Sequence, residues 1–185
     1  MTKEDLYVKV DAQQEILKEI AHKLWTYAEP AFQEVKSCAL LKSYMKDQGF
    51  RIKEVPNMPT AFIAEYGQGY PVIGILGEYD ALPGLSQKVQ TTQEPVEEGG
   101  SGHGCGHNLL ATGCVGAVVA VKNQIETDKL QGTIRYYGCP AEEQLVGKPM
   151  MSKEGVFDDL DIALSWHPAS NTEVVRFSSL AVNSI

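Results

Sequence analysis

The sequence has few basic residues and no long uninterrupted apolar run. Lys and Arg total 16 against 24 Asp and Glu, the formal net charge is −8 at pH 7, and no basic cluster occurs. Nucleic-acid-binding proteins present basic patches, so this composition predicts no nucleic-acid partner. The longest apolar stretch, Leu109 to Val121, is interrupted by Gly and Thr. A membrane span needs about 20 predominantly apolar residues, so we also expect no membrane partner.

The sequence has few cysteines, and their spacing does not match a paired cysteine motif. The four cysteines lie far apart with no Cys-x-x-Cys pair, and the opening Met-Thr-Lys-Glu-Asp-Leu lacks the apolar stretch of a secretory signal. We therefore expect a cytoplasmic protein whose cysteines are free thiols or metal ligands. Three of them are interpreted as structural residues: Cys38, Cys114 and Cys139.

Helical and strand patterns alternate along 185 residues, a length sufficient for one domain with a sizeable core. Helices are predicted at 4–28, 33–48, 109–127 and 148–153, and strands at 50–55, 61–66, 71–77, 133–139 and 161–166. The 71–77 run is apolar on both faces, as in a strand buried within a sheet. We predict an α/β fold, a mixed and mostly parallel sheet with helices on both faces. Residues 84–104 form a long polar loop, which is usually functional or mobile.

The segment from Ser101 to Asn108 contains three potential metal ligands, His103, Cys105 and His107, separated by glycines. Glycine allows the tight backbone turn that would let these side chains converge, and Asn108 is predicted to cap the helix that follows. Thiolate and imidazole suit zinc and similar metals better than magnesium or calcium. Taken alone, the motif is equally compatible with a glycine-rich turn around a buried cysteine.

Three further clusters follow predicted strands, and each has a structural alternative. Glu142 and Glu143 could serve metal and proton chemistry, or form an exposed acidic pair at a helix start. His167 could be a ligand or a hydrogen-bonded core residue. Glu78 and Asp80 could include a carboxylate that orients a ligand, or a turn aspartate. Ligand sites in α/β sheets form beyond the carboxyl ends of the strands, so these clusters are predicted to meet at one rim.

The order of these motifs resembles that of a known group of enzymes. Gly-Glu-Tyr-Asp-Ala-Leu-Pro at 77–83, Gly-Cys-Gly-His-Asn at 104–108, Gly-Cys-Pro-Ala-Glu-Glu at 138–143 and Ser-Trp-His at 165–167 resemble the co-catalytic metallopeptidases and aminoacylases. The Cys-Gly-His turn is similar to that of the amidohydrolase branch. The Asn that follows it and Tyr-Tyr-Gly-Cys-Pro at 136–140 look most like the B-type subunit of aminobenzoyl-glutamate hydrolases.

The resemblance implies a zinc-peptidase-like catalytic domain that uses two divalent metal ions, with zinc or manganese expected. It implies a metal-activated water that cleaves an N-acyl amino acid, aminobenzoyl-glutamate or a dipeptide. Its metal ligands would be Cys105, His107, Glu143 and His167, with Glu142 as general base and Asp80 orienting a ligand. His103 has no firm role in this pattern, and Glu78 stands where distant branches use a His ligand.

Members of this group are longer and carry an inserted lid and dimerisation domain, followed by a last His ligand. We therefore expect residues 1–180 to be the N-terminal part of the catalytic domain and 181–185 to begin the insertion. The full-length relatives are expected to be homo-oligomers, and this chain to bind metal weakly and turn over substrate slowly. The alternatives are a catalytically incompetent fragment or pseudo-enzyme that acts with a partner chain, and a single structural zinc site.

Overall fold

The computed structural model describes residues 3–171, so the predicted boundary at 181–185 lies outside the described part. The elements in chain order are α1 (Lys3–Asp11), α2 (Gln14–Tyr27), α3 (Val35–Asp47), β1 (Arg51–Val55), β2 (Met58–Gln68), β3 (Val72–Glu78), α4 (His107–Asp128), β4 (Gly132–Cys139), α5 (Gly147–Lys153) and β5 (Ile162–Leu164). The predicted alternation of helix and strand is confirmed.

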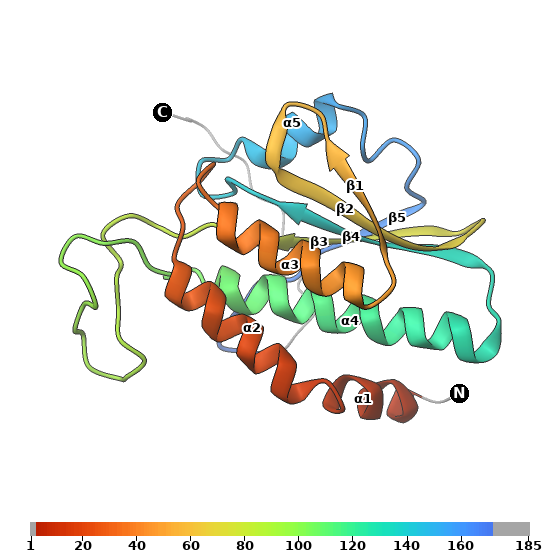
Figure 1. Cartoon of the computed structure of the whole chain (residues 1–185), viewed down its shortest axis with the longest axis horizontal. Helices are drawn as coiled ribbons and strands as arrows, with labels where there is room; N and C mark the ends of the chain where they lie inside the picture. The colour runs from red at the N-terminus through yellow and green to blue at the C-terminus, as the bar shows by residue number, and fades with distance from the viewer. Residues whose placement is uncertain (1–2, 172–185) are drawn as a thin grey trace.

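The strands form one mixed sheet in the order β1-β2-β4-β3-β5 (Figure 1). β2 pairs antiparallel with both β1 and β4, whereas β3 pairs parallel with β4 and β5. β2 is therefore the one strand of this sheet that runs against the others. The mixed α/β sheet is as predicted, but its strand pairs are divided equally between parallel and antiparallel, because β2 lies between β1 and β4 and runs opposite to both.

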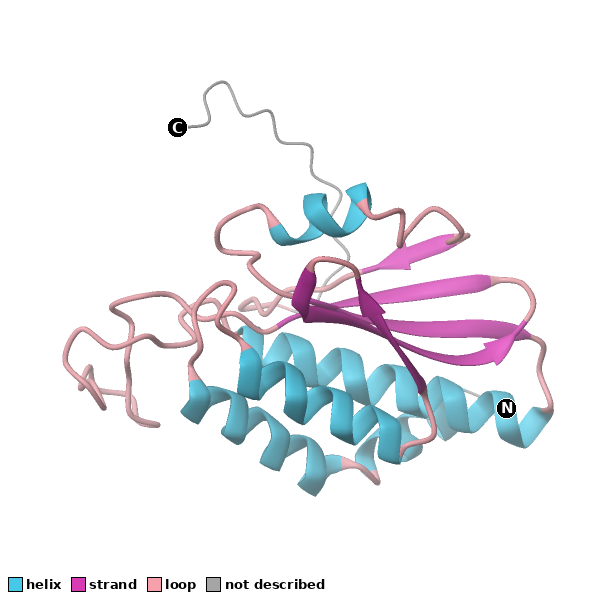
Figure 2. Ribbon diagram, turned by 45° about the horizontal axis from the view of Figure 1, so that its top comes forward, coloured by secondary structure: helices cyan, strands magenta, loops and turns pink. Residues whose placement is uncertain are grey.

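Helices cover both faces of the sheet, as predicted. Figure 2 shows α1 to α4 on one face and α5 on the other. The larger core, between the sheet and α2, α3 and α4, contains the fully buried Leu24, Leu41, Leu110 and Tyr136. Burying a Leu side chain stabilises a fold by about 1.5–3 kcal/mol, so this face holds the helices in place. None of the helices within residues 3–171 is long and apolar enough to cross a membrane.

The helix predicted at 4–28 is two helices, α1 and α2, with a break at Ala12 and Gln13. The Gln13 side chain donates hydrogen bonds to the carbonyl oxygens of Lys9 and, at 3.4 Å, of Gly116 in α4. α1 has no buried residue, whereas α2 buries Ile20 and Leu24. The change of direction allows α2 to pack against α4, and this tertiary contact overrides the continuous helical pattern.

The parallel strands β3, β4 and β5 end at the same edge of the sheet, at Glu78, Cys139 and Leu164. The long loop that follows β3 extends from this edge (Figure 1), and its base is closed by reciprocal backbone hydrogen bonds between Leu82 and Gly102. The three segments that carry the predicted site residues therefore leave the sheet side by side.

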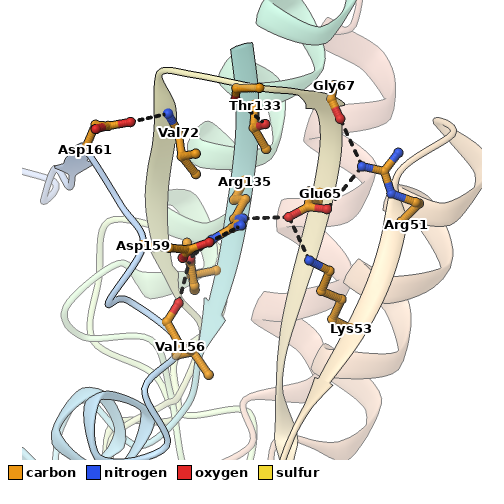
Figure 3. A network of polar contacts seen from close by, with 12 residues as sticks. Arg51, Lys53, Glu65, Gly67, Val72, Thr133, Arg135, Val156, Asp159 and Asp161 are labelled. Atoms are coloured by element: carbon orange, nitrogen blue, oxygen red, sulfur yellow. Dashed lines mark hydrogen bonds and ion pairs between the residues drawn. The ribbon is translucent and has the colours of Figure 1, made fainter.

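A buried carboxylate organises the charges on the α5 side of the sheet (Figure 3). Glu65 accepts hydrogen bonds from Lys53 at 2.8 Å, Arg51 at 3.1 Å and Arg135 at 2.7 Å. Arg135 also pairs with Asp159, which ties β4 to the segment before β5. Burial raises the pKa of Glu65, but these three cations outweigh it and lower the pKa to about 2.

We expect Glu65→Gln to lower the free energy of unfolding at pH 7 by about 2 to 3 kcal/mol. Because the folded-state pKa lies below the ordinary value of 4.5, the contribution is present above pH 4.5 and is lost as the pH falls toward 2. Urea unfolding of both proteins between pH 7 and pH 2.5 measures this difference. Glu54→Gln is the control, because Glu54 is largely exposed in its pair with Lys42. Equal effects of the two substitutions would contradict the prediction.

Candidate metal centre

His107 is fully buried at the first position of α4 and lies at the centre of the site. Its Nδ1 is 3.0 Å from the backbone oxygen of Asp80 and 3.1 Å from Asp80 Oδ1. Both partners only accept, so the neutral ring carries its proton on Nδ1 and presents a lone pair at Nε2. The other Asp80 oxygen accepts from the backbone N–H of Glu143 at 2.9 Å. One carboxylate thus fixes both the imidazole and the acidic loop after β4.

Two groups of potential ligands meet at His107. One consists of Cys105, His107 and His167, and the other of Glu78, His107 and Glu142; within each group the ligand atoms lie within 4.8 Å of one another. The rings of His107 and His167 are nearly perpendicular, with centroids 5.8 Å apart. The structure therefore brings the predicted residues to one rim of the sheet, while their individual roles stay predictions.

The backbone conformation of Gly106 allows Cys105 and His107 to face one site. Gly106 has a φ of 75°, in the left-handed region that favours glycine, and it precedes α4 as the N-cap residue. The prediction that Asn108 caps this helix is therefore wrong. Asn108 lies inside α4, almost fully buried, and its side-chain amide donates to the Ala21 carbonyl oxygen of α2. The helix begins two residues earlier than its apolar pattern indicated.

Acidic neighbours set the protonation of the site in the absence of a metal ion. A hydrogen bond with Glu143, followed by burial, raises the pKa of the Cys105 thiol to about 11. Burial and the nearby Glu78 carboxylate raise the pKa of Glu142. Burial alone would lower the pKa of His107, but the hydrogen bond to Asp80 and the surrounding carboxylates raise it. Negative charge is therefore concentrated around this imidazole, as a cation-binding site requires.

His103 faces away from these ligand groups. It is 5% exposed and its Nε2 donates to the backbone oxygen of Leu24 in α2 at 3.0 Å. Burial lowers its pKa to about 4, so the ring is neutral at pH 7. His103 therefore anchors the turn that contains Cys105 to α2, and it lies in a loop as the sequence indicated.

Two residues near the site were not found from the sequence. Lys148 of α5 places its Nζ 2.6 Å from Glu78 Oε1. The fully buried Glu34 accepts a hydrogen bond from the backbone N–H of Ala141 at 2.8 Å, and Ala141 has a left-handed φ of 53°. Glu34 thus holds the backbone immediately before Glu142. Neither residue belongs to a recognisable motif, because both reach the site only through packing between distant elements.

The fold and this arrangement are similar to those of known metal-binding peptidases. The sequence pattern of the family described as Peptidase family M20/M25/M40 matches residues 74–177, and the chain belongs to this family. The structure is similar to that of a dinuclear metal-binding peptidase of the M20 family from Bacillus subtilis, with a TM-score of 0.72 and 26% identity over 83% of this chain and 42% of that one.

Curated relatives extend the comparison. The chain is 46% identical to the B-type subunit of p-aminobenzoyl-glutamate hydrolase from Escherichia coli (strain K12) over 93% of its own length and 36% of that protein. It is 30% identical to N-acetylcysteine deacetylase of Bacillus subtilis (strain 168), covering 78% of this chain and 37% of the relative. The chain thus spans little more than a third of the length of these relatives.

We expect Asp80→Asn to weaken binding of divalent metal about 10- to 100-fold, because residues that orient a ligand have effects of this size. The amide can still accept from His107 Nδ1, but its nitrogen cannot accept from the Glu143 backbone. Metal titration followed by calorimetry measures the change, and circular dichroism checks the fold. Asp47→Asn, at the exposed end of α3, is the control. Unchanged affinity in Asp80→Asn would contradict the orienting role.

Proposed function

We propose that this chain provides catalytic residues of a metal-dependent amidohydrolase that cleaves the amide bond of an N-acyl amino acid, aminobenzoyl-glutamate or a dipeptide. The observation that carries the proposal is the fully buried His107, whose Nε2 has no hydrogen-bond partner although thiol, imidazole and carboxylate groups surround it. A buried lone pair without a partner is costly, and a metal ion would satisfy it.

The donor set fits divalent metal ions. Cys105, His107, Glu143 and His167 offer thiolate, imidazole and carboxylate donors, which suit zinc and, in a mixed set, manganese. The dinuclear centre of the Bacillus subtilis relative supports two metal ions here. When bound, such ions would lower the pKa of a water molecule from 15.7 to about 7 and polarise the substrate carbonyl.

The protein residues then perform the proton transfers and the positioning. Glu142 is 3.9 Å from His107 Nε2 and is partly exposed, so its carboxylate can reach both the centre and a substrate. We assign it the role of general base that takes a proton from water and delivers it to the leaving amine. Its raised pKa brings the carboxyl closer to the working pH, which favours this exchange. Asp80 keeps His107 in the ligand tautomer.

Relatives support the substrate class. Their names describe hydrolysis of p-aminobenzoyl-glutamate, deacetylation of N-acetylcysteine and cleavage of Xaa-Arg dipeptides. All three reactions break an amide bond next to an amino acid. On this basis we assign residues 1–180 to the N-terminal part of the catalytic domain.

A second candidate is a subunit that acts only with a partner chain. β5 is at the edge of the sheet, all three of its residues are exposed, and Trp166 beyond it is 44% exposed. An exposed apolar edge strand is a template for pairing with another strand. The Escherichia coli relative is itself named as one subunit of its hydrolase, which is consistent with this candidate.

We expect Cys105→Ala to bind less divalent metal than the wild-type chain after dialysis against the same free metal concentration. The substitution removes the sulfur ligand that lies beside His107. Cys38, in contrast, is buried in the core away from the site. Cys38→Ala is therefore the matched control. Elemental analysis of the three proteins gives the result. Full metal content in Cys105→Ala would exclude this residue as a ligand.

We expect Glu142→Gln to keep its metal but to reduce hydrolysis of N-acyl amino acids and dipeptides by at least about 100-fold, the usual contribution of a general base. Initial rates at saturating metal measure the effect, with Glu154→Gln on the exposed end of α5 as control. Hydrolysis at the wild-type rate would refute the assignment. A metal-loaded wild-type chain without hydrolytic activity would favour the subunit candidate.

A further inference from the structure

Glu78 is a buried carboxylate whose role the family resemblance leaves open. It is the last residue of β3 and is 6% exposed. Its Oε2 lies 3.2 Å from His107 Nε2, yet Nε2 makes no hydrogen bond. Because both partners of His107 Nδ1 only accept, a neutral His107 ring carries its proton on Nδ1, and Nε2 and Glu78 Oε2 are then both electron-pair donors. Two such atoms 3.2 Å apart in the protein interior are stabilised by a positive charge between them, supplied either by a proton on Nε2 or by a metal ion.

The spacing of these two atoms suits a shared metal ion. Nitrogen and oxygen ligands lie about 2.0–2.2 Å from zinc, so neighbouring ligands of a tetrahedral ion are about 3.3–3.6 Å apart. The observed 3.2 Å between His107 Nε2 and Glu78 Oε2 is close to this edge length. Glu142 Oε2 is farther, at 3.9 Å from the same nitrogen, which agrees with a base that stands beside the ion.

The charge balance also calls for a cation at this position. Four carboxylates contact His107 or its neighbours: Glu78, Asp80, Glu142 and Glu143. Lys148 is the one cationic side chain paired with any of them among the described residues, and it contacts Glu78 Oε1 at 2.6 Å. Buried carboxylates are stable only when paired or metal-bound, so one ammonium group leaves an excess of negative charge.

We propose that Glu78 is an additional metal ligand, coordinating through Oε2 the same ion as His107 Nε2. Lys148 is a positioning residue: its bond to Oε1 leaves a single oxygen free and so keeps this carboxylate monodentate. The inference rests on the proposed metal centre and adds to it a carboxylate ligand from the end of β3. It also explains why a carboxylate at this position is compatible with metal binding, where distant branches have histidine.

Cobalt(II) is a suitable probe because its absorption spectrum reports coordination number and ligand type. We expect Glu78→Gln to bind cobalt at least about 10-fold more weakly than wild type and to alter the ligand-field bands. Glu78→His supplies a different donor at the same position, so it should bind cobalt more tightly than Glu78→Gln. Circular dichroism of each apo-protein separates loss of a ligand from loss of the fold.

Lysine variants test the second half of the proposal. Lys148→Met should change the cobalt spectrum, because the freed Oε1 can also coordinate, whereas Lys153→Met on the exposed side of α5 should leave it unchanged. Identical spectra for the two lysine variants would overturn the role of Lys148.

Two other results distinguish failure of this inference from failure of the proposed function. Wild-type cobalt affinity and spectrum in Glu78→Gln, together with loss of metal in Cys105→Ala, would overturn the Glu78 ligand and leave the metal centre standing. No cobalt bound by the wild-type chain would overturn both. Weaker binding by Glu78→Gln that Glu78→His does not improve would show a requirement for the negative charge alone, and would also refute coordination.

Discussion

The site depends on one buried carboxylate. Asp80 accepts hydrogen bonds from His107 Nδ1–H and from the backbone N–H of Glu143, so it joins the start of α4 to the loop after β4. A hydrogen bond to a charged group contributes about 1.5–3 kcal/mol, and Asp80 makes two at full burial. The tautomer of the imidazole, the direction of its free nitrogen and the place of the acidic pair all follow from this residue.

The protein brings negative charge together at this rim and supplies little to neutralise it. The parallel strands end at one edge, so the end of β3 and the segments after β3 and β4 bring carboxylates to the same place, and Lys148 is the only lysine or arginine paired with them in the described part of the chain. These carboxylates repel one another, so a cation bound at this edge of the sheet would stabilise the fold. On the opposite half of the same sheet Glu65 is surrounded by three cationic groups, so that carboxylate stabilises the fold without any ligand.

The sequence allowed most of the elements and the general location of the site to be predicted, for specific physical reasons. Apolar periodicity identified the helices and strands because burial on one face repeats with the geometry of each element. It failed at Ala12 and Gln13, where the helix is interrupted and the Gln13 side chain contacts Gly116, 103 residues away. It also misplaced the start of α4, because the left-handed Gly106, and not Asn108, ends the turn.

The sequence by itself determined which chemistry is available: a Cys-Gly-His turn, an acidic pair after a strand and a histidine after another, in an order that resembles one family. Tertiary structure alone decided which of these side chains meet, and how. The Asp80–His107 bond, the Glu78–Lys148 pair and the Glu34–Ala141 bond join residues 27, 70 and 107 positions apart. Spacing along a chain does not encode such contacts, because the order of strands in the sheet and the packing of helices on it set them.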